Sequence, residues 1–135
     1  MDIAKCEALK AELAVQTEPQ TVSIDRFFDG NDDIGSIGCN LADHPGVDAF
    51  RDIFTSLRRR PDVEAIYAQI SELDPGEGCW PFTDTVLVVG TIPADELRSV
   101  VSTLEPDDVG LAGDCDLSPS IASKHQQPVL VLWWD

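Results

Sequence analysis

The feature that most constrains the fold is a run of residues, 85–92, that is apolar on both sides of an extended chain. In a strand, Val86 and Val88 point to one face, and Leu87 and Val89 point to the other. A strand that is apolar on both faces must be covered on both faces, which is typical of a central position. The sequence therefore predicts a sheet with this segment in its middle.

The flanking segments predict further strands and helices. Residues 63–73 alternate between apolar and polar side chains, and residues 129–134 are almost wholly apolar, so both predict strands. Residues 47–60 carry apolar side chains three or four positions apart, and a similar stripe follows Pro93, so both segments predict helices. A short strand is also predicted over residues 34–40, where Ile37 and Cys39 share a face.

In chain order these elements form the β-α-β-β-α-β pattern of the ferredoxin-like fold. We predict one α+β domain over residues 1–135, with an extra N-terminal helix within residues 1–19 and a long acidic loop at residues 105–127. This topology places the last strand at an edge of the sheet, and an exposed apolar edge promotes aggregation. We therefore expect the N-terminal helix or a second copy to cover it, in a monomer or in a homodimer through that C-terminal edge strand.

The net charge of the chain limits the classes of partner that it can bind. It has 25 acidic and 9 basic side chains, with a formal net charge of −16. This balance argues against a nucleic-acid partner, which requires clustered Lys and Arg, and against an anionic membrane surface. The N-terminus does not resemble a secretory signal, and the four cysteines are then expected to be reduced thiols. We therefore predict a cytoplasmic protein.

One acidic loop holds the best candidate ligand residues. Asp29, Asn31 and Asp33 match the first three ligand positions of an EF-hand calcium loop, but Ile34 and Asn40 stand where the Gly and the Glu are required. We therefore favour a solvated loop with local side-chain hydrogen bonds. No metal site and no cofactor is predicted, either here or in the acidic loop at residues 105–127.

Nucleophilic catalysis has one candidate group, formed by Cys39, Asp43 and His44, but closeness in sequence does not show that these side chains converge. We predict no catalytic residue. Trp80 follows a Gly-rich turn, where it forms an exposed aromatic lip or, as we favour, part of the core. The residues predicted to bind a ligand or a partner are Asp29, Asn31, Asp32, Asp33, Ser36, His44 and Trp80.

Two segments, FFDGNDDIGSIGCN at residues 27–40 and WPFTDTV at residues 80–86, resemble a group of small acidic bacterial proteins of uncharacterised function. The resemblance covers residues 22–135. In size and charge this group is similar to the immunity proteins of bacterial toxin systems. The resemblance implies no catalytic residues.

Two functions are therefore expected. The first is a non-enzymatic acidic module, of the immunity-protein or inhibitor type, that binds a basic protein by electrostatically accelerated association. The alternative is a small metal- or ligand-binding enzyme that uses the loop at residues 29–40.

Overall fold

The computed structural model describes residues 1–112 and 119–135. These residues form a five-stranded antiparallel sheet with the strand order β1-β2-β3-β5-β4. Its strands are β1 (Thr21–Ser23), β2 (Val63–Glu72), β3 (Phe82–Gly90), β4 (Asp108–Leu111) and β5 (Val129–Trp133). The predicted α+β class is confirmed.

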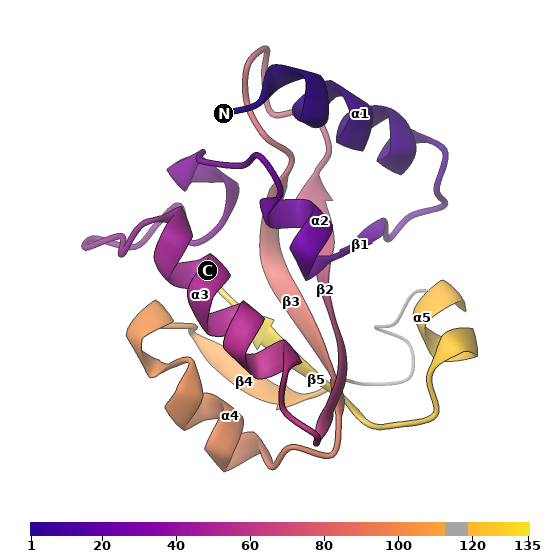
Figure 1. The fold of residues 1–135 in the computed structure, drawn as a ribbon, viewed down its shortest axis with the longest axis vertical. Coiled ribbons are helices and arrows are strands. Elements are labelled where there is room, and N and C mark those ends of the chain that lie inside the picture. The colour runs from indigo at the N-terminus through magenta and orange to yellow at the C-terminus, as the bar shows by residue number, and fades with distance from the viewer. Residues whose placement is uncertain (113–118) are drawn as a thin grey trace.

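The helices are distributed unequally over the two faces of the sheet (Figure 1). The helices α1 to α4 cover the first face, and the short α5 covers part of the second. Their bounds are α1 (Ile3–Ala14), α2 (Ile24–Phe28), α3 (Val47–Arg58), α4 (Ala94–Val100) and α5 (Pro119–Lys124). Two 3-10 turns, η1 (Ile34–Ser36) and η2 (Ser102–Leu104), complete the described structure. Of the two faces, the second is therefore the less covered by the described residues.

The central position of β3 is confirmed, because β3 pairs with β2 on one side and with β5 on the other. Val86 and Val88 lie in the main core on the helix-covered face. Leu87 and Val89 belong to a smaller core on the second face, where Ile121 of α5 packs against them. The two-sided apolar pattern thus reflects two separate cores.

The predicted helices are also confirmed. In α3 the apolar stripe buries Phe50, Phe54 and Leu57 completely or almost completely. Burial of each such side chain contributes roughly 1.5–3 kcal/mol. The same spacing rule explains the buried Leu97 of α4.

The strand predicted over residues 34–40 is wrong. The segment begins with the turn η1, and in it only Ile37 forms an isolated bridge, which is parallel to Thr83. The side chain of Asn31 accepts from the N–H of Asp33, and the side chain of Asp33 accepts from the N–H of Gly35, each at 2.9 Å. Such local bonds compete with the pairing of strands and favour turns.

The ferredoxin-like topology is not confirmed. That fold places its first strand between its third and its last strand, whereas in the described sheet the last strand, β5, lies directly beside β3. The isolated bridge of Ile37 lies where the first ferredoxin-like strand would pair with the third. Because residues 34–40 form no strand, β5 pairs directly with β3 instead.

The long acidic loop predicted at residues 105–127 contains regular secondary structure in the part that the structure describes. Both β4 and α5 lie in this range, and β4 pairs along the outer side of β5. The C-terminal strand is therefore not at an edge, and neither α1 nor a second chain is needed to cover it. Asp114, Cys115 and Asp116 lie outside the described residues.

The two true edges of the sheet carry side chains that bind their backbone. On β1, the Gln16 amide donates to the carbonyl of Thr21 and accepts from its N–H, both at 3.0 Å. On β4, Arg98 Nη2 donates to the carbonyl of Val109 at 2.8 Å. Occupied edge groups oppose pairing with another chain. Within the described ranges, no helix has the length and apolar character that crossing a membrane demands.

Candidate functional site

The loop that follows α2 is held together by the residues that the sequence singled out as ligands. Asn31 is 1% exposed, and its Nδ2 donates to Ser36 Oγ at 3.0 Å and to the carbonyl of Phe27 at 3.4 Å. Ser36 is fully buried. Both side chains therefore point into the protein and not toward solvent.

The three aspartates of this loop bind groups from distant parts of the chain. Asp29 accepts from Lys5 Nζ at 2.7 Å, and this hydrogen bond lowers the pKa of the Asp29 carboxyl. Asp32 pairs with the N-terminal amine at 2.9 Å. Asp33 accepts from the N–H of Trp80 at 3.1 Å. The loop thus connects the N-terminus, α1 and the start of β3.

His44 and Trp80 also have partners within the fold. His44 Nδ1 accepts from the N–H of Gly46 at 2.9 Å, so its Nε2–H is the donor to the carbonyl of Ile37 at 2.8 Å. Neither nitrogen binds Cys39 or Asp43. Trp80 is fully buried. The structure brings the predicted residues together around one loop, where most of their polar atoms form intramolecular bonds, whereas the buried indole Nε1 of Trp80 has no hydrogen-bond partner among the described residues.

Among residues 1–112 and 119–135, no group of three or more His, Cys, Asp or Glu side chains is arranged to hold a metal ion. The carboxylates of the loop diverge toward separate partners, whereas hard cations require several converging oxygens.

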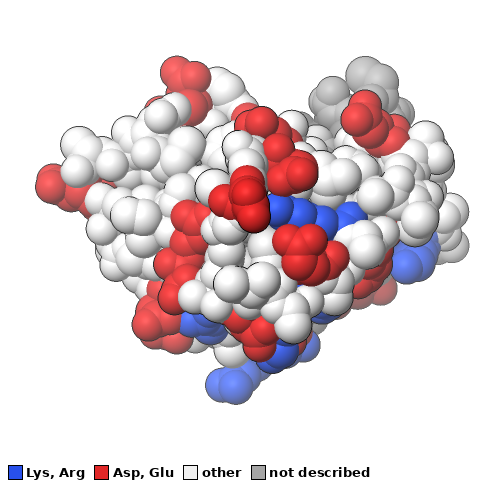
Figure 2. All heavy atoms as spheres, turned by 90° about the horizontal axis from the view of Figure 1, so that it is seen from above, with Lys and Arg blue, Asp and Glu red and all other residues white. Residues whose placement is uncertain are grey.

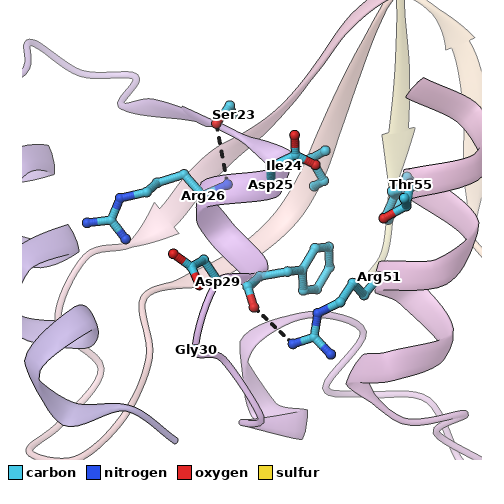
Figure 3. A pocket seen from close by; sticks show the side chains of 10 residues that line it. Ser23, Ile24, Asp25, Arg26, Asp29, Gly30, Arg51 and Thr55 are labelled. Atoms are coloured by element: carbon cyan, nitrogen blue, oxygen red, sulfur yellow. Dashed lines mark hydrogen bonds between the residues drawn. The ribbon is translucent and has the colours of Figure 1, made fainter. Parts of the chain in front are cut away.

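A hollow of about 610 Å³ lies between α2 and α3 (Figure 3). Its charged groups are paired: Asp25 with Arg58 at 2.9 Å, and Arg51 with Asp48. Arg51 also donates to the carbonyl of Phe28 at 2.9 Å, which is the bond drawn beside α3 in Figure 3. Few polar atoms therefore remain for a ligand in this hollow.

The second face of the sheet presents a different arrangement. The strand registers place Gln69 of β2 opposite Thr85 of β3, Thr85 opposite Trp133 of β5, and Trp133 opposite Asp108 of β4. These four side chains form one row across four strands, beyond the apolar cluster that Ile121 covers. We call Gln69, Thr85, Trp133 and Asp108 the Trp133 row.

The Trp133 row borders a hollow of about 350 Å³, which we call the Trp133 groove. Trp133 is 40% exposed, although it is a large aromatic residue. Gln69 Oε1 is buried and has no hydrogen-bond partner among the described residues. The groove is lined by this row together with Leu87, Gly110, Leu111, Ala112 and Val131. An exposed indole and an unsatisfied acceptor that line one hollow are unusual on a protein surface and mark a candidate binding site.

A second polar arrangement on this face holds α5 in place. His125 lies between Tyr67, whose hydroxyl is 2.7 Å from Nε2, and Glu64, whose Oε2 is 3.1 Å from Nδ1. Burial, with a smaller contribution from Glu64, raises the pKa of Tyr67. The phenol therefore stays protonated near neutral pH. This chemistry fits a structural hydrogen bond better than an activated nucleophile.

Most Lys and Arg side chains of the protein form ion pairs with its own carboxylates. Of nine Lys and Arg side chains, seven form ion pairs, namely Lys5, Lys10, Arg26, Arg51, Arg58, Arg60 and Arg98. Arg59 and Lys124 form none within the described residues. Figure 2 shows acidic side chains spread over one face, with basic ones among them. The remaining carboxylates give the surface its negative potential.

Comparison with known proteins places the chain in a family. Residues 4–130 match the model of the family described as "Uncharacterized protein YfbO family". The chain belongs to the YfbO family. A protein of Escherichia coli (strain K12), "Uncharacterized protein YfbO", is 29% identical over 117 residues, which cover 84% of this chain and 81% of the relative. No solved structure matches the chain.

Membership of the YfbO family confirms the resemblance to an uncharacterised bacterial group; it does not show the similarity to immunity proteins. We did not predict the Trp133 row from sequence. Its members come from four strands, and only the registers bring them together. One signal was available, because Trp133 and Trp134 must point to opposite faces of the last strand.

Proposed function

We propose that this member of the YfbO family is a non-enzymatic binding protein whose partner is a positively charged polypeptide. The observation that carries the proposal is the charge balance: the net charge is −16, and seven of the nine cations are already paired within the chain. A strong single-sign field accelerates association with an oppositely charged protein. A basic toxin, with this chain as its inhibitor or immunity protein, is one partner of this kind.

The loop at residues 29–40 gives less support to the alternative, an enzyme. Its candidate ligands bind the N-terminus, Lys5 and the backbone of Trp80 instead of converging on one point. We also propose that the protein is cytoplasmic. The thiols of Cys6, Cys39 and Cys79 are free, and thiols stay reduced in the cytoplasm.

The test is the association of the purified protein with a synthetic peptide of alternating arginine and glycine, followed by stopped-flow fluorescence. We expect saturable one-to-one binding, and an association rate that falls about tenfold as the salt concentration rises to roughly 0.3 M. A peptide of alternating serine and glycine is the matched control and should not bind. An association rate that does not change with salt, or equal binding of both peptides, would contradict the proposal.

A further inference from the structure

We propose that the Trp133 groove receives a guanidinium or alkylammonium group from an Arg or Lys side chain of the partner polypeptide. This inference rests on the proposed function, since it identifies the part of the surface on which a cationic partner docks. A second copy of this chain is a poor source of that side chain, because seven of its nine cations already form ion pairs.

The polar groups of the groove are suited to a donor with a positive charge. Asp108 is an exposed carboxylate that has no ion-pair partner in the described part of the chain. Gln69 Oε1 is an acceptor without a donor. Thr85 Oγ1 donates its proton to Asp84 Oδ1 at 2.8 Å. Toward a group in the groove, this hydroxyl can therefore act only as a hydrogen-bond acceptor. Among the described residues that line the groove, none is Lys or Arg.

The indole of Trp133 adds an attraction that is specific for cations. Trp is the aromatic side chain that binds cations most strongly over its face, and Arg is the cation found there most often. Trp133 is 40% exposed, and Asp108 lies directly opposite it on β4. An aromatic face and a carboxylate at neighbouring positions attract the same group.

The shape of the groove fits one long side chain. Val131, which is partly exposed, contributes apolar surface, against which the methylene stem of Arg or Lys packs while its charged end reaches the acceptors. Gly110 stands opposite Val131 on β4, and a Cβ added to it would meet no atom within 4 Å. The missing side chain leaves the space for an entering group, and the volume of about 350 Å³ is too small for a folded element.

Calorimetric binding of the arginine–glycine peptide to four variants tests the inference. Asp108→Asn removes the carboxylate, Trp133→Leu removes the indole, and Gly110→Val adds a side chain to the groove at a position where a Cβ meets no atom within 4 Å. Asp52→Asn removes one exposed carboxylate on α3 and is the control for net charge. We expect each of the first three changes to weaken binding about fivefold or more, and Asp52→Asn to change it less than about twofold. Urea unfolding of each variant verifies that the fold is intact.

The possible outcomes separate the inference from the function on which it rests. If the wild type binds one-to-one but Asp108→Asn and Gly110→Val bind as tightly as Asp52→Asn, the groove is not the site and the proposed function stands. If the wild type does not bind the peptide even at low salt, the proposed function itself fails. A matching lysine–glycine peptide that binds more weakly would assign the site to guanidinium; equal binding would assign it to either cation.

Discussion

Replacement of Asn31 by Ala separates a structural role of the acidic loop from a ligand-binding role. The Asn31 side chain makes hydrogen bonds of 2.9 Å with the N–H of Asp33, 3.0 Å with Ser36 Oγ and 3.4 Å with the carbonyl of Phe27. Asn31 and Ser36 are both buried. Each bond contributes about 1 kcal/mol, and a buried partner left without its bond costs more. We therefore expect Asn31→Ala to lower the free energy of unfolding by about 2–4 kcal/mol.

Urea unfolding followed by tryptophan fluorescence measures this loss, because the fully buried Trp80 becomes exposed on unfolding. For a domain of this size, the melting temperature should fall by roughly 10 °C. Asp32→Asn is the matched control, since the Asp32 side chain is 75% exposed and, among the described residues, pairs only with the N-terminus; its effect should stay below about 1 kcal/mol. If Asn31→Ala is as stable as Asp32→Asn, the loop is not the structural element described above.

Two further predictions concern the sheet. Tyr67 is the one tyrosine in the chain, and its raised pKa means that its contribution to stability is complete below a pH of about 10 and is lost as the pH rises through the higher pKa of the folded state. Absorbance titration of the phenol should therefore show a higher midpoint in the folded protein than in urea, and equal midpoints would contradict the burial of Tyr67. Gly90→Ala should cost about 3 kcal/mol or more, because the added Cβ would lie 2.2 Å from the carbonyl oxygen of Asp62. Gly110→Ala meets no atom within 4 Å and should be neutral or stabilising, so similar urea midpoints for the two variants would refute this reasoning.

The elements that could be predicted are those whose signal lies within one segment. The spacing of Phe50 and Phe54 defines α3, and the apolar run of residues 85–92 defines β3, because side-chain period and burial agree locally. The strand β4 was missed since Asp108 and Gly110 both disfavour strands, and β4 forms through its pairing with β5, some twenty residues later in the chain.

The residues of the candidate site also divide into those with a signal within one segment and those brought together by strand pairing. Asn31 and Asp33 were recognised as residues with special roles, because their local hydrogen bonds leave a trace in the sequence. For the Trp133 row the sequence holds only the signal of two adjacent tryptophans, since Gln69 and Asp108 are ordinary surface residue types until the register of four strands aligns them. Sites made by strand pairing are therefore harder to predict than sites made by one loop.

The most direct test of the account is the mapping of backbone and indole N–H resonances while the arginine–glycine peptide is added to isotope-labelled protein. The account predicts saturable shifts at the indole of Trp133 and at the backbone of Thr85, Asp108 and Gly110. Resonances around the hollow between α2 and α3 should remain in place. Shifts of equal size over all acidic surfaces, or shifts confined to the loop at residues 29–40, would contradict it.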